Sequence, residues 1–227
     1  MKVIIVAASR NEIRNLTERL DFNMAFDNNI SSYNLGDTDV DVLITGHGTV
    51  FTTYHLLKAL NLFNYDLAIN AGIAGSYDYF LELGSVVNVI QDQFADLGYE
   101  EIDSFFTLSE KEMLKENSYP FTGEVLKNNE TYNIHEVESL LQVKSVTLNT
   151  LNINMDRIAR IKSKFNCDIE TMEGAAFFYV CMMEKIPFLQ IRSISYFVEL
   201  RKVENWHIPV AVRNLSEAVY KIIGALR

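Results

Sequence analysis

The residues best suited to chemistry are acids that stand where strand-like segments give way to helix-like ones. Glu173 lies in such a junction, and the small residues Gly174, Ala175 and Ala176 follow it, so a ligand can approach the backbone closely there. Glu12 comes soon after the first apolar segment of the chain. In parallel α/β sheets, ligands bind outside the carboxyl ends of the strands. Each acid could equally be a favourable charge in the first turn of a helix, so the local sequence leaves its role open.

A cation and a hydroxyl are expected at the same edge. Arg192 and Ser195 lie at the end of the apolar segment Phe188–Ser195. If that segment is a strand of the same parallel sheet, its carboxyl end meets those that precede Glu12 and Glu173. Two carboxylates and an arginine at one edge could hold a water molecule and activate it for attack on a sugar carbon.

Two glycine-containing turns also follow strand-like segments. Thr45-Gly46-His47-Gly48-Thr49 is neither a GxGxxG motif nor a phosphate loop with its Lys-Ser/Thr, and it is typical of a structural turn. Asn70-Ala71-Gly72-Ile73-Ala74-Gly75-Ser76 offers a flat surface of backbone groups. That surface suits a planar ligand such as a sugar or base, and it suits close packing of a helix on a strand equally well.

Composition and charge exclude several classes of protein. A net charge of −10 argues against non-specific nucleic-acid binding, which needs a basic face. The four histidines have no metal-ligand spacing, and the two cysteines are typical of small buried residues. The apolar N-terminal run is too short for a signal peptide, and no segment approaches the roughly 20 apolar residues of a membrane span. We therefore expect a cytoplasmic protein without a membrane or metal partner.

The elements that must position these groups alternate along the chain. Apolar runs rich in Val, Ile and Leu predict strands at Lys2–Ala8, Val40–Thr45, Leu67–Ala71, Ser85–Ile90, Val143–Asn149 and Phe188–Ser195. Helical spacing predicts helices at Asn11–Leu20, Val50–Phe63, Met155–Phe165, Gly174–Glu184 and Pro209–Leu226. Because no linker-like segment occurs, we expect one domain over residues 1–227: a three-layer α/β/α fold with a mostly parallel, mixed central sheet. The polar stretch Tyr99–Glu138 shows no clear strand and is expected to leave the sheet.

Motifs in the same order resemble one enzyme family over essentially the whole chain. The string Thr171-Met172-Glu173-Gly174-Ala175-Ala176, the loop Asn70–Gly75 and the strand end Arg192-Ser193-Ile194-Ser195 resemble those of the purine nucleoside phosphorylase/nucleosidase superfamily. Gly46 and Gly48 match its first glycine turn. Glu12 falls at the position of its water-activating glutamate. The resemblance implies that Met172 packs on a ribose and that Glu173 binds the ribose hydroxyls.

Within this superfamily the chain resembles the futalosine hydrolase branch most. Phe94-Ala95-Asp96-Leu97-Gly98 and the segment from Arg192 through Val198 and Arg201 to Trp206 are similar to that branch's motifs. The resemblance implies hydrolysis of the N-glycosidic bond of futalosine or its amino analogue, releasing the purine in menaquinone biosynthesis. Water is then the co-substrate, and no metal or organic cofactor is implied. It also implies a homodimer or a higher homo-oligomer.

Position 196 departs from the family pattern. Tyr196 stands where the superfamily places Asp, or Asn in the futalosine branch, to hydrogen-bond the purine and help it leave. Glu12, by contrast, favours hydrolysis over phosphorolysis, because a carboxylate repels phosphate and can take a proton from water. Two alternatives remain open: a methylthioadenosine/adenosylhomocysteine nucleosidase, and a catalytically impaired nucleoside-binding protein.

The resemblance gives a candidate site that can be compared with the structure. The expected catalytic residues are Glu12, Glu173, Arg192 and Tyr196. The expected substrate contacts are Thr171, Met172, Ile73, Ala74, Phe94, Asn149, Thr150 and Trp206. Of these, Phe94 and the backbone around Asn149–Thr150 are expected to contact the base.

Overall fold

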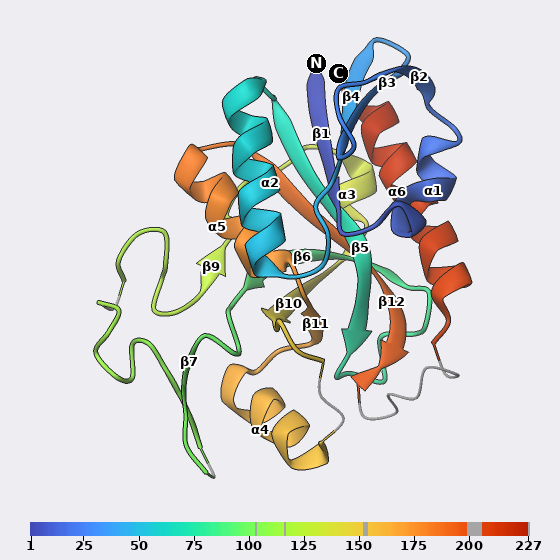
Figure 1. Cartoon of the computed structure of the whole chain (residues 1–227). Coiled ribbons are helices and arrows are strands. Elements are labelled where there is room, and N and C mark those ends of the chain that lie inside the picture. The colour runs from blue at the N-terminus through green and yellow to red at the C-terminus, as the bar shows by residue number, and fades with distance from the viewer. Residues whose placement is uncertain (103, 116, 152–153, 199–205, 227) are drawn as a thin grey trace.

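A large mixed sheet with helices on both faces forms the body of the molecule (Figure 1). The computed structural model describes residues 1–102, 104–115, 117–151, 154–198 and 206–226. Its strands are β1 (Lys2–Ala7), β2 (Asp21–Ala25), β3 (Ile30–Leu35), β4 (Thr38–Ile44), β5 (Leu67–Ser76), β6 (Val86–Asp92), β7 (Gly98–Glu100), β8 (Phe105–Thr107), β9 (Leu126–Lys127), β10 (Leu141–Thr147), β11 (Ile169–Thr171) and β12 (Phe188–Phe197). Its helices are α1 (Arg10–Thr17), α2 (Thr49–Leu62), α3 (His135–Glu138), α4 (Met155–Phe165), α5 (Gly174–Glu184) and α6 (Ile208–Ala225).

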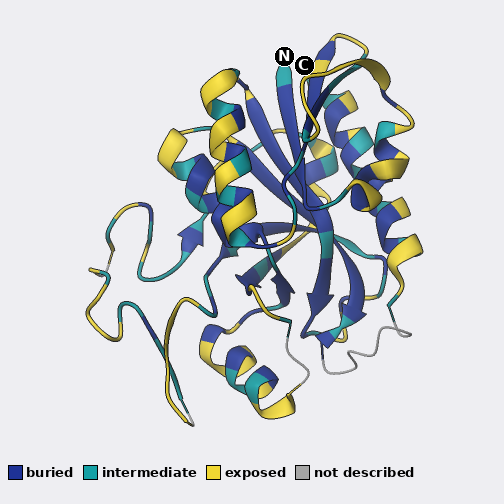
Figure 2. Cartoon of the chain, in the orientation of Figure 1, coloured by how far each residue is buried: buried dark blue, intermediate teal, exposed yellow. Residues whose placement is uncertain are grey.

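The centre of the sheet is parallel. Strands β4, β1, β5 and β12 lie side by side, and each neighbouring pair runs in the same direction. Both faces of these strands are covered, which explains the continuous apolar run of β1, whose residues Val3–Ala7 are fully buried (Figure 2). Parallel pairing brings the carboxyl ends of β1, β5 and β12 to one edge, as the sequence predicted.

One end of the sheet closes on itself. The strand order runs β5, β12, β6, β10 and β11, and β11 pairs with β5 as well as with β10. These five strands therefore form a ring. The ring places β11 directly beside β5, although about a hundred residues separate them in the sequence.

Two apolar cores lie on the two faces of the sheet. On one face, α2 and α5 pack over the strands through residues such as Leu56, Phe177 and Phe178. On the other face, α1 and α6 pack through residues such as Leu16 and Val219. The outer faces of these helices are exposed (Figure 2). The predicted fold class, helices on both sides of a mixed sheet, is confirmed.

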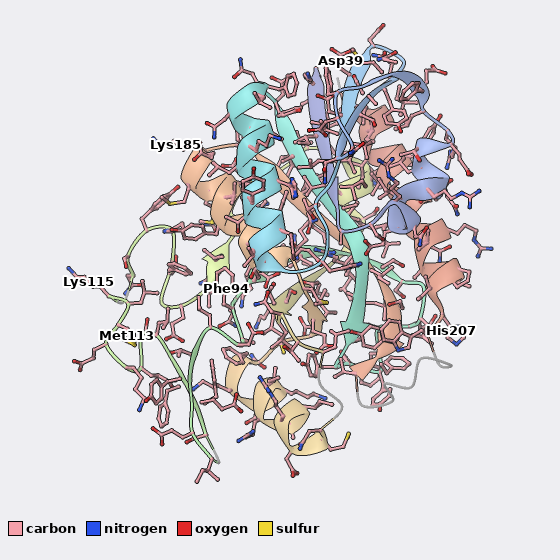
Figure 3. The ribbon with its side chains drawn as sticks, in the orientation of Figure 1. Asp39, Phe94, Met113, Lys115, Lys185 and His207 are labelled. Atoms are coloured by element: carbon pink, nitrogen blue, oxygen red, sulfur yellow. The ribbon has the colours of Figure 1, made fainter. Side chains whose placement is uncertain are left out.

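Two parts of the chain differ from the prediction. No strand was predicted at β2 or β3, which form a hairpin at the edge of the sheet; every residue of β2 is exposed, and neither strand is a continuous apolar run like those of the central strands. The stretch Tyr99–Glu138 does leave the sheet, but it is not without strands: β7 pairs with β8, and β9 adds to β6. Met113 and Lys115 lie on a loop of this stretch that projects to one side of the sheet (Figure 3).

The length and polarity of the helices decide whether any of them could cross a membrane. In the part that the structure describes, no helix is both long enough and apolar enough to cross a membrane. Arg201, which belongs to one of the motifs noted in the sequence, lies outside the described residues.

Candidate active site

A pocket of about 290 Å³ opens at the edge of the sheet where β1, β5, β11 and β12 end. Most of the residues expected from the sequence line this pocket: Glu12, Ile73, Ala74, Thr171, Met172, Glu173, Tyr196 and Trp206. They come from segments that are far apart in the chain. The fold therefore brings both predicted carboxylates into one cavity.

Glu12 is held by backbone groups on both of its oxygens. It is the third residue of α1, and its Oε2 accepts hydrogen bonds from the backbone N and the Oγ of Ser9 at 3.0 and 3.2 Å. Its Oε1 accepts from the backbone N of Ile73 at 3.2 Å. Burial, and next the charge on Glu173, raise the pKa of Glu12 above 4.5, whereas Arg192 lowers it. A carboxylate with a raised pKa at a pocket wall suits a general base.

Glu173 stands at the start of α5, where its side chain is buried. Its Oε1 accepts a hydrogen bond from the backbone N of Gly48 at 3.2 Å and lies 3.8 Å from Nδ1 of His47. Glu173 raises the pKa of the His47 imidazole. The turn that the sequence indicated as structural, Thr45–Thr49, thus also supplies groups to the site.

Arg192 lies beneath the pocket and does not line it. Its side chain is 1% exposed; Nη1 is 3.7 Å from Oε2 of Glu173, and Nη2 donates a hydrogen bond to Oδ1 of Asn70. A Cβ atom on Gly72 would come within 2.2 Å of Nη1 of Arg192 and within 3.1 Å of Oε1 of Glu12. Because residue 72 is a glycine, the guanidinium of Arg192 has room beside it. The positive charge of Arg192 offsets the negative charges of Glu12 and Glu173.

The hydroxyl of Tyr196 is directed at Glu170 of β11. The hydroxyl donates a hydrogen bond to Oε1 of Glu170 at 2.9 Å, and the ring stacks on Trp206 with 4.5 Å between centroids. Burial, and then the charge on Glu173, raise the pKa of Tyr196 above 10, so the hydroxyl stays protonated at neutral pH.

A buried polar network holds the start of α5. Thr147 Oγ1 donates to Oδ1 of Asp92 at 2.9 Å and accepts from the backbone N of Ala175 at 2.7 Å. Thr171 Oγ1 accepts from the backbone N of Gly174 at 3.2 Å. These bonds satisfy N–H groups of the first turn of α5, which would otherwise have no partner. They fix the position from which Met172 and Glu173 reach the pocket.

Three expected substrate contacts lie away from this pocket. Phe94, labelled in Figure 3, lines a different cavity of about 320 Å³. Oδ1 of Asn149 accepts hydrogen bonds from the backbone N and the Oγ1 of Thr49 at the start of α2, and its backbone N donates to Asp96. Thr150 is exposed and is not among the lining residues.

The pocket also contains residues that the sequence reasoning did not assign to it. They are Ser9, Asn11, His47, Leu151, Glu170, Ile208 and Val212. Glu170 carried no clear signal: it lies in the short run Asp168-Ile169-Glu170-Thr171, where three of the four residues are polar, so the pattern did not mark it as buried. Ile208 and Val212 carried none, since their place depends on how α6 packs.

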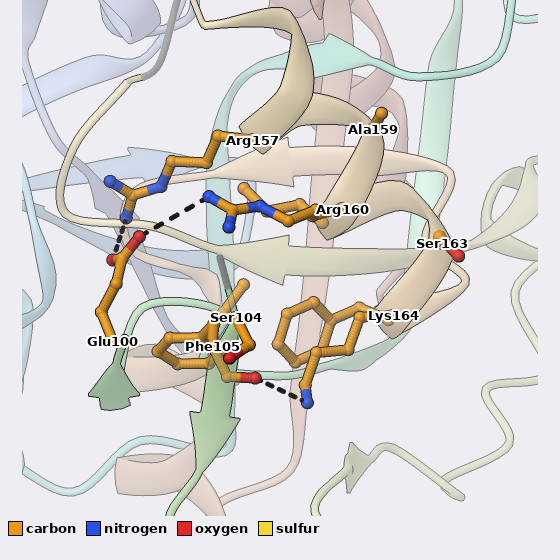
Figure 4. Close-up of a pocket in the computed structure, with 11 residues that line it drawn as sticks. Glu100, Ser104, Phe105, Arg157, Ala159, Arg160, Ser163 and Lys164 are labelled. Carbon is orange, nitrogen blue, oxygen red and sulfur yellow. Dashed lines mark hydrogen bonds and ion pairs between the residues drawn. The ribbon is translucent and has the colours of Figure 1, made fainter. Parts of the chain in front are cut away.

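A larger cavity of about 470 Å³ lies between α4 and the β7–β8 hairpin (Figure 4). None of the expected site residues lines it. Glu100 is 3.6 Å from Arg157 and 3.8 Å from Arg160, and Lys164 donates to the backbone O of Phe105 (Figure 4). The charged side chains that line this cavity therefore already have partners within the protein. Over the described residues, no group of three His, Cys, Asp or Glu side chains is placed to hold a metal ion.

Known proteins that this chain resembles include several nucleosidases. A 5'-methylthioadenosine/S-adenosylhomocysteine nucleosidase of Buchnera aphidicola is 27% identical, with 96% of this chain and 94% of that protein covered. The structure of the nucleosidase of that name from Colwellia psychrerythraea, in complex with adenine, matches with a TM-score of 0.81 at 21% identity, over 100% of this chain and 96% of that one. The structure of futalosine hydrolase of Helicobacter pylori matches with a TM-score of 0.83 at 18% identity, and the match covers 100% of this chain and 98% of that one.

A family model covers nearly the whole of the sequence. The model of the phosphorylase superfamily matches residues 2–223, a range that contains Glu12, Glu173 and Arg192. The match spans the strands that carry the pocket as well as the helices that cover them. The chain belongs to the phosphorylase superfamily.

Proposed function

We propose that this protein hydrolyses the N-glycosidic bond of a purine nucleoside. The observation that carries the proposal is the pair of buried carboxylates, Glu12 and Glu173, in one pocket with Arg192 beneath them. A buried carboxylate is costly unless it is paired, so two of them at a cavity wall indicate chemistry rather than packing.

The mechanism assigns a separate task to each group. Glu12, whose pKa is raised, takes a proton from a water molecule that attacks the anomeric carbon. The bond to the base breaks with oxocarbenium character. Glu173 binds the ribose hydroxyls, Met172 packs on the sugar, and Arg192 keeps the two carboxylates together below the pocket.

Hydrolysis is favoured over phosphorolysis because the backbone N–H groups near Glu12 already donate to its carboxylate. The backbone N–H groups of Ser9 and Ile73 both donate to Glu12. Donors of this kind are what a phosphate ion would need. Because they are directed at a carboxylate of the protein itself, an incoming phosphate would meet a negative charge instead of free donors.

Futalosine, or its amino analogue, is the proposed substrate within this reaction class. Support comes from Phe94–Gly98 and from the segment between Arg192 and Trp206, which resemble that branch, and from the similarity in fold to futalosine hydrolase. The rival substrate is methylthioadenosine or adenosylhomocysteine, which is named in the curated relatives. The family's Asp at position 196, which that activity would call for, is replaced here by Tyr196.

We also propose a homo-oligomer in the cytoplasm. The exposed face of α2 carries Val50, Phe51, Tyr54 and Leu57, which gives an apolar stripe at helical spacing. Such a stripe on an outer helix is typical of a surface that another chain covers.

The decisive experiment compares four nucleosides. Purified protein is incubated separately with futalosine, aminodeoxyfutalosine, methylthioadenosine and inosine, and free purine is measured by chromatography. Release from a futalosine alone supports the proposed substrate, and release from methylthioadenosine supports the rival. Tight binding of a nucleoside without release would point to a binding protein and reject hydrolysis.

A further inference from the structure

The pocket has a second acidic end, formed by Glu170 of β11 together with Tyr196 and Trp206. Glu170 is 2% exposed, yet it lines the cavity. Its Oε1 accepts a hydrogen bond from Tyr196 and its Oε2 accepts one from Tyr77 at 2.7 Å. This carboxyl group is distinct from the Glu12 and Glu173 pair, which hydrogen-bonds to Ser9, Ile73 and Gly48 instead.

The ring of strands creates this arrangement. Glu170 pairs with Gly75 of β5 on one side, and Tyr196 of β12 pairs with Gly75 on the other. The three residues therefore form a row across three strands. A Cβ atom on Gly75 would lie 2.4 to 2.7 Å from the ring and hydroxyl of Tyr196. Because residue 75 has no side chain, the tyrosine can cross β5 and reach the carboxyl group.

The surroundings suit a heterocyclic ring more than a sugar. Tyr196 and Trp206 stack with 10° between their planes, so this end of the pocket is aromatic. The indole Nε1 of Trp206 is buried and has no hydrogen-bond partner among the described residues, which leaves an N–H group for a ligand acceptor. The proposed function places the sugar near Glu12 and Glu173, so the aromatic end is left for the departing base.

We propose that Glu170 is the acid that neutralises the leaving base, with Tyr196 as its positioning residue. This assignment rests on the proposed nucleosidase activity. When the bond between C1' and the base nitrogen breaks, the bonding electron pair stays with the base. Glu170 in its carboxylic acid form gives its proton to the base, which leaves neutral, and becomes a carboxylate. The hydroxyls of Tyr77 and Tyr196 then donate to that carboxylate, as the structure has them, and stabilise it.

This assignment also accounts for the departure at position 196. A tyrosine on β12 with a raised pKa is a poor acid, but its hydroxyl is a good donor to a neighbouring carboxylate. The carboxyl group that acts on the base is then supplied by β11, which lies on the other side of β5. A purely structural Glu170 would serve only to satisfy buried tyrosine hydroxyls.

The test compares two substrates that differ in their need for a proton. One is the nucleoside that the wild-type protein cleaves; the other is 4-nitrophenyl β-D-ribofuranoside, whose phenolate leaves as a stable anion. Glu170→Gln is expected to lower kcat for the nucleoside by about 10²–10⁴-fold and kcat for the nitrophenyl riboside by less than about tenfold.

Tyr196→Phe and Tyr77→Phe form a matched pair. Each removes one hydroxyl from Glu170, but only Tyr196 lines the pocket. Tyr196→Phe is expected to lower nucleoside kcat more than Tyr77→Phe does, and to lower kcat for the nitrophenyl riboside by less than about tenfold. Melting temperatures check that all variants fold.

Two results would overturn the assignment in different ways. If wild-type protein cleaves neither substrate, the nucleosidase proposal fails, and the role of Glu170 fails with it. If the wild type is active and folded Glu170→Gln loses equal activity on both substrates, or none on the nucleoside, the role of Glu170 alone is rejected.

Discussion

At the scale of single residues, the site depends on charges that are buried and yet offset. Burial, and then repulsion from Glu173, raise the pKa of Glu12, and Arg192 supplies the opposing charge. The types of these residues could be read from the sequence, and so could their expected edge of the sheet. The partners could not: the donors to Glu12 are backbone groups of Ser9 and Ile73, which have no signature in residue type.

Glu12→Gln tests the base. The amide cannot take a proton from water, so kcat is expected to fall by about 10²–10⁴-fold. In the wild type, a base must be deprotonated to act; kcat/KM should therefore decline as the pH falls through the raised pKa of Glu12, with a midpoint above 4.5. Steady-state rates across pH measure both effects. A Glu12→Gln protein that releases purine at the wild-type rate would refute the assignment.

At the scale of elements, close approach between strands decides where side chains can reach. Helices α4 and α5 begin and end as the sequence predicts; the apolar spacing of α4 is regular, whereas α5 is apolar along almost its whole length. The hairpin of β2 and β3 was not predicted, because its strands are partly polar and lack the continuous apolar runs that marked the buried strands. The sequence also could not show why residue 75 must lack a side chain. That requirement arises only because β11 and β12 lie on either side of Gly75 in the folded protein.

Gly75→Ala is expected to disturb the row that Gly75 forms with Glu170 and Tyr196. The new methyl group would meet the ring of Tyr196, so either the tyrosine or the strands must move, which costs about 1–3 kcal/mol of stability. Gly224→Ala is the control: it lies in α6 with open space around it and should stabilise the protein by about 0.5 kcal/mol. Urea unfolding compares the two variants. Equal stability changes would contradict the close contact.

At the scale of the whole molecule, the closed ring buries polar groups that influence stability. Asp92 is fully buried between β6, β10 and β12, and burial raises its pKa from 3.8 to about 6. Its oxygens accept hydrogen bonds from Thr147 and Gln190. A group whose pKa is higher in the folded state stabilises the fold fully below its unfolded pKa, and that contribution is lost as the pH rises through the folded value.

Asp92→Asn should therefore gain stability relative to the wild type as the pH rises from about 4 to 7. The difference is expected to approach about 3 kcal/mol, from a shift of about two pKa units. The new amide can be accommodated if the Gln190 amide turns over, so that Oε1, which has no partner among the described residues, accepts from the new amide in place of the present Nε2 donor. Melting temperatures from pH 4 to 8 measure the difference; Asp37→Asn, at an exposed acid, should show none. A constant difference across pH would reject the raised pKa.

The proposed oligomer is tested on the stripe along α2. Tyr54→Glu together with Leu57→Glu places charge on this exposed apolar face, so the variant is expected to have the mass of a single chain. Phe80→Glu, at another exposed aromatic residue, serves as the control and should keep the mass of the wild type. Light scattering after size-exclusion chromatography gives the masses. A wild type that is itself a single chain would exclude the oligomer.

The sequence by itself determined the layered α/β class, the main strands and helices, and the meeting of Glu12, Glu173 and Arg192 at one sheet edge. It could do so because apolar periodicity and the ends of parallel strands are local signals. Only the tertiary structure decided that β11 closes against β5, that Gly75 makes room for Tyr196, and that Glu170 enters the pocket. Those facts depend on contacts between segments far apart in the chain, and no local pattern of residue types encodes them.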